Sequence, residues 1–275
     1  MQTLTGKLDR YMTLIPLWAL LLIYLTVLSL IAILAYKKKW LTLSGSISAV
    51  VLGLIVLWMG GVSAFVVFLF FFVSSSLVSK LSKFVNRREK KGNRRDIVQV
   101  LANGVPAVIA IMLIRVPNLY IPALAAFSAA NAEATADTWS GAFGVMSHKD
   151  PVSIITFTKV PRGISGGVTA LGFLGGFSAS LLVAILSMGV FGHGFGITCI
   201  IAGSGFLGSV IDSVLGAVLQ VQYRAKDGSL TEIEEENGVK NERVRGIPGF
   251  DNDAVNFTSG LLAATLAMLL ATLVS

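Results

Sequence analysis

Long apolar runs separated by short polar segments dominate the chain. The first run, Leu14 to Tyr36, exceeds the roughly 20 residues that a membrane-spanning helix needs, and no small-residue cleavage site follows it. We therefore expect a retained transmembrane helix rather than a signal peptide. The next run, from about Leu43 to Phe72, is too long for one crossing, and Gly60-Gly61 divides it. The pattern predicts two helices joined by a tight turn at these glycines.

Further apolar segments bring the predicted number of crossings to eight. The expected fold class is all-α, a polytopic membrane bundle that forms a single domain over residues 1–275. The predicted spans are residues 14–36, 43–59, 62–79, 97–114, 119–140, 167–190, 196–220 and 254–273.

The distribution of positive charge gives this bundle an orientation. If both ends of the chain lie outside, the inside segments are those around residues 37–39, 80–96, 141–166 and 221–253, and they hold 19 of the 22 lysines and arginines. Such an excess is typical of cytoplasmic loops. The sequence therefore predicts that both termini face away from the cytoplasm.

Composition supports an integral membrane protein and excludes several kinds of site. Hydrophobic residues make up 54% of the chain and charged residues only 13%, whereas a soluble chain carries about a quarter charged residues. One cysteine and two histidines exclude a disulfide framework and a cysteine/histidine zinc site. Any metal must be held by oxygen ligands. The net charge of +7 reports orientation, and no segment has the pattern of a nucleic-acid surface.

Three acids fall within predicted spans, where carboxylates are costly and are functional candidates by default: Glu133, Asp137 and Asp212. Glu133 and Asp137 are four residues apart, which places them on one helix face. They repel each other unless they share a cation or a proton. A protonated acid that makes an interhelical hydrogen bond is the structural alternative, chiefly for Glu133. Asp137 and Asp212 both lie in the cytoplasmic halves of their helices, so they can converge.

The inside loops add candidate binding residues. A cationic, glycine-rich stretch over residues 156–167 runs into the sixth predicted span, and its amides, with Lys159 and Arg162, could hold phosphate; a flexible connector is the alternative. Asp251 could cap the last helix or belong to a magnesium-phosphate site. Asn103 interrupts the fourth span and needs a partner. Three further features carry weaker functional signals. They are the basic segment 80–95, the acidic residues 232–236, which are expected in a solvated hairpin or loop, and His193, which is expected on the outer side without a chemical role.

Five sequence motifs identify a resemblance that extends from about the second span to the end of the chain. In these motifs the chain resembles the phytyl-phosphate kinase family of the plant vitamin E pathway, whose prokaryotic relatives form domain-of-unknown-function family ninety-two. The motifs occur in the family's order and are Arg95-Asp96-Ile97-Val98-Gln99-Val100-Leu101-Ala102-Asn103-Gly104, Ala136-Asp137-Thr138-Trp139, Lys159-Val160-Pro161-Arg162-Gly163 with Gly166-Gly167-Val168, Asp212-Ser213-Val214-Leu215-Gly216-Ala217, and Asp251-Asn252-Asp253-Ala254-Val255-Asn256.

The resemblance implies phosphorylation of an isoprenyl monophosphate to the diphosphate, with a nucleoside triphosphate, expected to be CTP, as donor and Mg²⁺ as cofactor. The protein would lie in the plasma membrane of a prokaryote, take its lipid from the bilayer and bind no nucleic acid. The implied roles are magnesium binding by Asp137, Asp212, Asp251 and Asp253; phosphate binding by Lys159, Arg162, Gly163, Gly166 and Gly167; orientation of the second phosphate by Arg95 and Asn103; nucleotide binding by Asn252 and Asn256; and support of the metal by Glu133.

One position departs from the family pattern, and several alternatives stay open. Ala142 stands where the family commonly has a glutamate after its aspartate motif, which puts catalysis in question. Cytidylyl transfer to form a CDP-lipid would use the same groups. A lipid-phosphate transporter and a noncatalytic scaffold are the alternatives outside enzymes, although the polar residues gather at one side and no internal repeat is visible. The lipid chain length, the nucleotide base and the oligomeric state are open.

Overall fold

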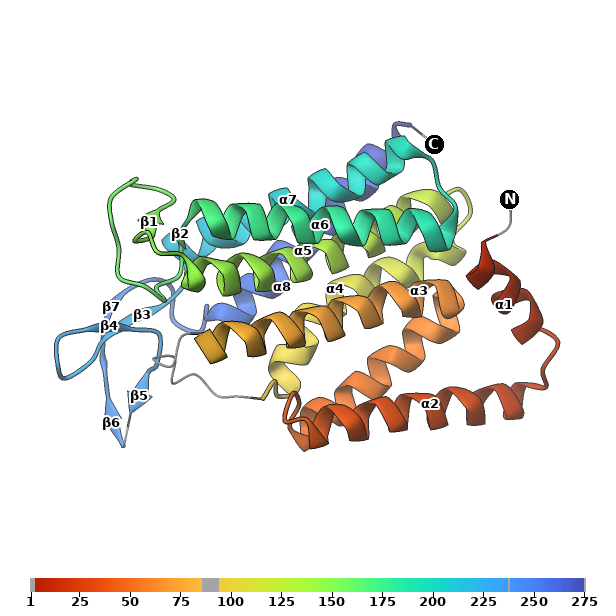
Figure 1. The fold of residues 1–275 in the computed structure, drawn as a ribbon, viewed down its shortest axis with the longest axis horizontal. Coiled ribbons are helices and arrows are strands. Elements are labelled where there is room, and N and C mark those ends of the chain that lie inside the picture. Colours follow the sequence, from red (N-terminus) through yellow and green to blue (C-terminus); the bar gives the residue numbers. More distant parts are fainter. Residues whose placement is uncertain (1–2, 86–93, 237, 275) are drawn as a thin grey trace.

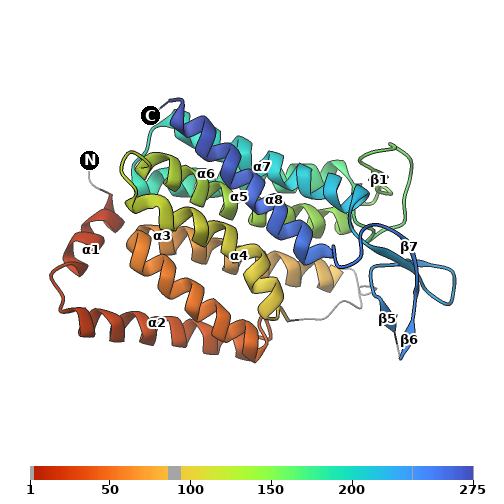
Figure 2. The same ribbon diagram turned by 180° about the vertical axis from the view of Figure 1, so that it is seen from behind.

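The structure is a computed structural model that describes residues 3–85, 94–236 and 238–274. Its helices lie side by side in an elongated bundle (Figures 1 and 2), which confirms the expected all-α membrane architecture. The helices are α1 (Leu4–Met12), α2 (Leu17–Lys37), α3 (Leu43–Val85), α4 (Ile97–Met112), α5 (Tyr120–Met146), α6 (Ala170–Phe191), α7 (Phe195–Val218) and α8 (Asn252–Thr272), with a 3-10 turn, η1, over Leu113–Arg115.

Helix α3 is two helices joined at a sharp bend. Gly61 interrupts it with φ 69° and ψ −164°, a backbone conformation that favours glycine. Figures 1 and 2 show the ribbon of α3 doubling back on itself. The Phe72 ring accordingly returns to within 6.0 Å of the Trp40 ring, which precedes α3. The predicted pair of helices with a turn at Gly60-Gly61 is therefore confirmed.

Helix α5 forms the centre of the bundle and packs on α3, α4, α6, α7 and α8. Alanines make up much of its buried surface, because small side chains allow neighbouring helices to approach closely. In the described part of the chain, six helices are long and apolar enough to cross a membrane on those criteria alone; α3 counts once among them and α5 is absent. The two halves of α3 and the enclosed α5 complete the eight predicted crossings. Since its neighbours enclose it, α5 can carry polar residues at membrane depth.

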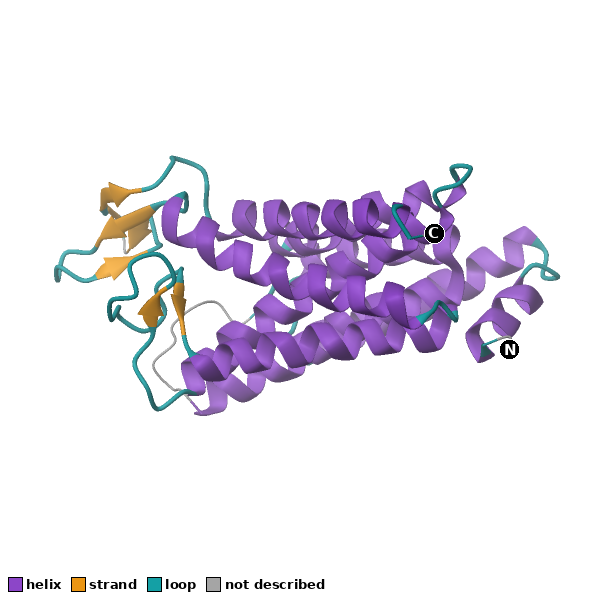
Figure 3. Ribbon diagram, turned by 90° about the horizontal axis from the view of Figure 1, so that it is seen from above, coloured by secondary structure: helices purple, strands orange, loops and turns teal. Residues whose placement is uncertain are grey.

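Short antiparallel strands gather at one end of the bundle, and both termini lie at the other (Figures 1 and 3). We call the first the strand end; it is the end that the positive charges predict to be cytoplasmic. The strands are β1 (Val152–Ser153) paired with β2 (Gly167–Val168); β3 (Gln222–Arg224), β4 (Leu230–Thr231) and β7 (Glu242–Arg245) in the order β4-β3-β7; and the hairpin of β5 (Glu235–Glu236) and β6 (Val239–Lys240).

Helix α6 begins three residues later than its predicted span. Thr169 is its N-cap, with the side-chain hydroxyl accepting from the Gly172 amide at 3.0 Å. Gly167 lies instead in β2, where it pairs with Ser153. The expectation that Gly166 and Gly167 supply amides of a helix start was therefore wrong, because strand pairing takes these residues before the helix begins.

The short helix α1 was not predicted. It packs against α3 and α6 at the end opposite the strands. Its Asp9 carboxylate accepts from the Val62 amide at 2.6 Å and from the Ser63 hydroxyl at 2.9 Å. Asp9 thus caps the second half of α3 from a distant part of the sequence.

Candidate functional site

Three membrane-embedded acids meet near the strand end and form what we call the carboxylate cluster, Glu133, Asp137 and Asp212. Glu133 and Asp137 come from α5 and Asp212 from α7. Asp137 and Asp212 line the same cavity and are close enough to affect each other electrostatically. The convergence of Asp137 and Asp212 expected from the sequence is present in the structure.

Ser259 of α8 joins two members of this cluster. Its hydroxyl oxygen lies 2.8 Å from Glu133 Oε1 and 2.9 Å from Asp212 Oδ2. A serine hydroxyl carries one proton and can donate to only one of these oxygens at a time. The other contact requires a proton on a carboxyl group or a bound cation nearby. The cluster is therefore built to hold an additional positive charge.

Glycines on α7 allow the cluster to form. A Cβ atom at Gly208 would lie 2.6 Å from the Glu133 Cγ, and one at Gly205 would lie 2.5 Å from the Ala132 Cβ. Helices α5 and α7 consequently approach so closely that Asp212, one turn beyond Gly208, reaches the acids of α5. Close helix packing therefore accounts for the glycine at position 208.

Two asparagines of α8 extend the cluster toward the strand end. The Asn256 amide nitrogen donates to Asp212 Oδ2 at 3.1 Å and to the Asn252 carbonyl oxygen at 3.2 Å, while the Asn256 side-chain oxygen accepts from Asn252 Nδ2 at 3.2 Å. The predicted site residues Asn252 and Asn256 thus lie directly beside the acids. Asn256 is buried, whereas Asn252 lines an open cavity.

This cavity, which we call the polar cavity, has a volume of about 380 Å³ and lies at the strand end, where residues next to β2 and β4 line it. Asp137, Asp212 and Asn252 line one side of it. The loop over residues 162–167 lines another side, and Glu232 contributes from the segment between β4 and β5. Acidic side chains and a glycine-rich loop therefore face one water-accessible space.

The glycine-rich loop already binds an anionic group. Gly163 and Gly166 have φ values of 83° and 81°, and Ser165 lies between them. The Ser165 amide donates to Glu232 Oε1 at 3.1 Å, and the Ser165 hydroxyl donates to the same oxygen. Successive amides in such a turn form a concave anion site. The acidic hairpin expected at residues 232–236 is present as β5 and β6, but Glu232 turns inward instead of facing solvent only.

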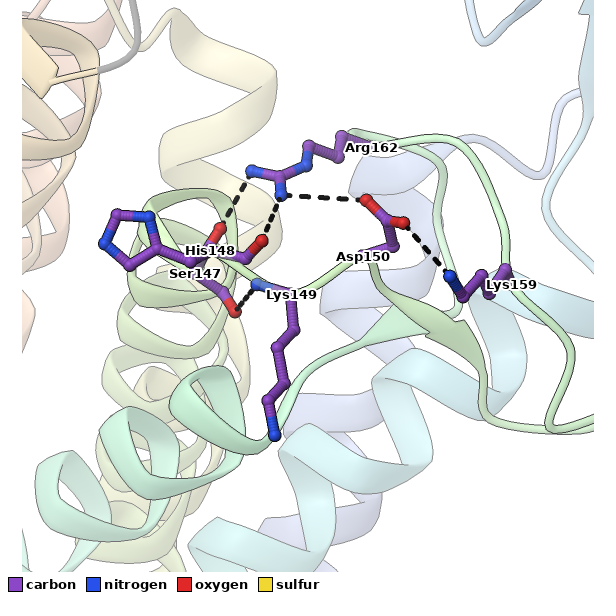
Figure 4. A network of polar contacts seen from close by, with 6 residues as sticks. All are labelled: Ser147, His148, Lys149, Asp150, Lys159 and Arg162. Atoms are coloured by element: carbon purple, nitrogen blue, oxygen red, sulfur yellow. Dashed lines mark hydrogen bonds and ion pairs between the residues drawn. The ribbon is translucent and has the colours of Figure 1, made fainter.

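Lys159 and Arg162, the two cations of the stretch over residues 156–167, contact Asp150 and backbone carbonyl oxygens (Figure 4). Arg162 donates to the Ser147 carbonyl oxygen at 2.8 Å and the His148 carbonyl oxygen at 3.2 Å, so its guanidinium lies against the two residues that directly follow α5. The Lys159 ammonium lies 3.5 Å from Asp150, and its side chain is 80% exposed. Arg162 still lines the cavity, whereas Lys159 does not. The structure thus separates Lys159 from the acids with which the sequence grouped it.

Arg95 and Asn103 line a different space, an apolar slot described below. Arg95 does not line the polar cavity, but it interacts electrostatically with Asp137, which does. Burial lowers the pKa of Arg95 to about 10, and the charge of Asp137 opposes that shift. Arg95 therefore remains a cation at neutral pH. Asn103 donates to the Gln99 carbonyl oxygen of its own helix at 2.9 Å, which supplies the partner that a polar residue needs in that span.

Asp251 and Asp253 do not line the polar cavity. Asp251 is the N-cap of α8 and accepts from the Asp253 and Ala254 amides, each at 3.0 Å, which is the capping role considered for it from the sequence. Within residues 3–85, 94–236 and 238–274, no three His, Cys, Asp or Glu side chains are grouped closely enough to hold a metal by themselves. The basic segment 80–95 lies in large part outside the described residues.

Comparison with known proteins agrees with this membrane architecture. Residues 26–264 match the family described as Integral membrane protein DUF92. The chain belongs to this family. Protein PGR of Arabidopsis thaliana is 30% identical over 86% of this chain and 91% of its own length, and an uncharacterized membrane protein of Methanocaldococcus jannaschii is 31% identical over 78% and 87%. An uncharacterized membrane protein of Synechocystis is 32% identical over 68% and 74%. No solved structure matches the chain.

The structure also shows where Ala142 lies, the residue at which this chain departs from the DUF92 family pattern. This residue is buried in α5 and does not line the polar cavity, whereas its neighbours Gly141 and Gly144 do. The loss of an acid at this position therefore leaves Asp137 and Asp212 in place at the cavity.

Sequence reasoning missed three residues of this DUF92 site: Ser165, Glu232 and Ser259. Ser259 follows Asn256 by three residues and thus lies on the same helix face, a spacing that could have indicated it. Ser165 and Glu232 are 67 residues apart, and neither carries a local signal.

Proposed function

We propose that this integral membrane protein is a lipid-phosphate kinase that transfers a phosphoryl group from a nucleoside triphosphate to an isoprenyl monophosphate at its strand end. One observation carries the proposal: membrane-embedded carboxylates from two helices face an anion-binding, glycine-rich loop across a single open cavity. Phosphoryl transfer depends mainly on positioning and on neutralising charge, and this pairing of groups supplies both.

The donor set of the carboxylate cluster fits magnesium. All of its groups are oxygens, the ligand type that Mg²⁺ prefers, and two of its acids, Asp137 and Asp212, line the open cavity. Three grouped protein ligands are not required, because Mg²⁺ typically takes one or two carboxylates and completes its shell with water and substrate phosphates. Asp137 and Asp212 would hold the ion, and Glu133 would act through Ser259. Bound there, magnesium would neutralise phosphate charge.

The chain's own residues supply the rest of the arrangement. The amides around Ser165 bind the terminal phosphates of the donor, and Arg95 holds the phosphate of the lipid. An oxygen of the lipid phosphate attacks the γ-phosphorus, the bond to the β,γ-bridging oxygen breaks, and nucleoside diphosphate leaves. The attacking group is already an anion, so no general base is needed. The resemblance to the phytyl-phosphate kinase family favours CTP as donor.

A product assay tests this function. Purified protein in lipid nanodiscs is given Mg²⁺, each radiolabelled nucleoside triphosphate in turn, and geranylgeranyl or phytyl monophosphate. A lipid diphosphate together with nucleoside diphosphate supports the kinase. Pyrophosphate with a CDP-lipid identifies a cytidylyltransferase instead, and the absence of turnover with every donor contradicts both enzymes.

Conservative variants connect the activity to the site. We expect Asp137→Asn and Asp212→Asn each to lower kcat about 100-fold or more while the protein stays folded. Glu234→Gln, an exposed acid outside the cavity, serves as the matched control and should leave kcat unchanged. Full activity in the Asp212→Asn variant would exclude the proposed role of the cluster.

A further inference from the structure

We propose that the apolar slot between α2, α3 and α4 binds the hydrocarbon chain of the lipid phosphate, with Arg95 at its mouth holding the phosphate. This inference rests on the proposed function and adds the place where the lipid is bound. The slot is separate from the polar cavity and lies within the part of the bundle that crosses the membrane.

The lining of the slot is suited to a hydrocarbon. Its walls come from α2, both halves of α3, and α4, and they are overwhelmingly apolar. The polar lining residues are Arg95, Gln99 and Asn103, all at the start of α4 or within its first two turns. One end of the slot is therefore polar and the remainder is apolar. An amphiphilic lipid has the same division, with a charged head group at one end of a hydrocarbon chain.

Arg95 lines the slot and interacts electrostatically with Asp137, which lines the polar cavity. It lies just before α4, with its backbone amide donating to the Trp40 carbonyl oxygen at 2.9 Å and its carbonyl accepting from the Thr42 amide at 3.0 Å. Its guanidinium lies 5.9 Å from the centre of the Phe71 ring and in the field of Asp137. Among the described residues, none is hydrogen-bonded to this guanidinium. A half-buried guanidinium carries five N–H donors, so an anionic ligand is the group that would satisfy them.

The depth of the slot matches one leaflet. Gly104, which lines its inner end, is nine residues beyond Arg95, and a helix rising 1.5 Å per residue covers about 12–14 Å over that stretch. Packing closes the slot there, since a Cβ at Gly104 would lie 2.6 Å from the Leu52 Cδ1 and one at Gly53 would lie 2.6 Å from the Leu28 Cδ2. A phosphate at Arg95 thus places its chain within the leaflet at the strand end.

Among the candidate membrane spans of the described residues, α2, which forms the outer wall of the slot, is the least buried. Helix α2 runs along the edge in Figures 1 and 2, packs mainly on α3, and buries only Tyr24, Leu28, Ala32 and Ala35. The enclosed volume of the slot is about 60 Å³, so a chain enters when α2 moves outward. Such an opening faces the bilayer, where the lipid is dissolved.

A pair of phenylalanine substitutions on α3 tests the slot. Ala49 lines it, whereas Val51, two residues away, is 52% exposed on the lipid side. We measure the affinity of the protein in nanodiscs for geranyl and geranylgeranyl monophosphate without nucleotide. The wild type should prefer the longer chain. Ala49→Phe should weaken geranylgeranyl binding about tenfold, the loss expected when roughly two methylenes are no longer buried, and Val51→Phe should not.

A head-group variant separates the two ends of the ligand. Arg95→Gln should weaken both lipid phosphates by a similar factor, because it removes the phosphate contact and leaves the slot intact. Wild-type affinity in Ala49→Phe, or an equal loss in Val51→Phe, would overturn the slot. Should Ala49→Phe not fold, a geranylgeranyl monophosphate carrying a diazirine at the chain end replaces it: labelling of α2, α3 or α4 supports the slot, and labelling elsewhere overturns it. Since these measurements need no turnover, the slot and the kinase activity can fail independently.

Discussion

The carboxylate of Glu232 accepts hydrogen bonds from both the backbone amide and the hydroxyl of Ser165, and so it sits on the glycine-rich loop at the position that the proposed function gives to a phosphate. The two residues belong to different segments of the strand end, one before β2 and the other after β4. An anionic substrate that binds this loop must compete with Glu232.

Glu232→Gln should therefore strengthen nucleotide binding. A hydrogen bond to a charged group contributes about 1.5–3 kcal/mol, and glutamine keeps an oxygen that accepts from Ser165, so only part of this energy is lost. The Kd for a nucleoside triphosphate should therefore fall several-fold, up to about tenfold. Binding of a fluorescent nucleotide measures this change. Glu234→Gln is the matched control on an exposed neighbour and should have no effect. A weaker affinity in Glu232→Gln would show that Glu232 supports nucleotide binding instead of competing with it.

Ser259 should stabilise the carboxylate cluster. Ser259→Ala removes the hydroxyl that Glu133 and Asp212 share, which leaves membrane-embedded acceptors without their donor and should cost about 1–3 kcal/mol. Ser259→Thr, which keeps a hydroxyl, should lose less. Thermal unfolding in detergent is the measurement, and Thr265→Ala, an exposed hydroxyl on the same helix, is the control. Equal unfolding midpoints for Ser259→Ala and Thr265→Ala would contradict the bridging role.

Substitutions at Gly166 and Gly163 separate the effect of close packing from the effect of backbone strain. Both have positive φ values, which cost a non-glycine residue about 1–2 kcal/mol. A Cβ at Gly166 would in addition lie within 3 Å of Ala217 on α7, whereas one at Gly163 would meet nothing within 4 Å. We expect Gly166→Ala to displace the loop and lower nucleotide affinity more than Gly163→Ala does. The same nucleotide-binding assay tests this order, and a reversed order would contradict it.

The Asp9 cap should matter for stability and not for the site. Asp9→Ala removes the acceptor for Val62 and Ser63 and should destabilise the protein by about 1 kcal/mol, the usual value of a helix N-cap. Lys7→Ala, an exposed change on the same helix, should be neutral. Nucleotide affinity at the opposite end should be unchanged in both variants. A lowered nucleotide affinity in Asp9→Ala would show that α1 is coupled to the polar cavity.

His193 should make the outer end sensitive to acid. It lies between α6 and α7, 9% exposed, with Nε2 2.9 Å from the Ser187 hydroxyl, which in turn lies 2.8 Å from the Ser128 hydroxyl. Burial lowers the pKa of His193, and a hydrogen bond to the Gly194 carbonyl opposes that shift. The folded state thus favours the neutral ring.

The sign of the effect follows from this preference. The stabilising contribution of neutral His193 is fully present above the ordinary histidine pKa of about 6.5. It is lost as the pH falls below that value toward the lowered pKa of the folded state. The unfolding midpoint should therefore drop between about pH 7.5 and pH 5. His193→Gln should show a smaller drop, while His148→Gln, an exposed histidine, should follow the wild type. An identical pH response in His193→Gln would contradict this account.

The sequence by itself determined the membrane class, the spans and the turn in α3. These features depend on local properties: runs of apolar residues long enough to cross a bilayer, and two glycines where one run is too long. It also indicated Asp137 and Asp212, because carboxylates are costly at membrane depth, while the family resemblance indicated Asn252 and Asn256.

Only the tertiary structure decided which of the loop residues face the acids. Lys159 and Arg162 lie in the same motif as Gly163, yet their charged groups turn to Asp150 and to the end of α5. Ser259 joins Glu133 to Asp212 because close packing at Gly208 brings α7 against α5. Glu232 reaches Ser165 across 67 residues. Hydropathy and spacing act along the chain, whereas these contacts depend on how separate helices and loops pack, which the local pattern does not specify.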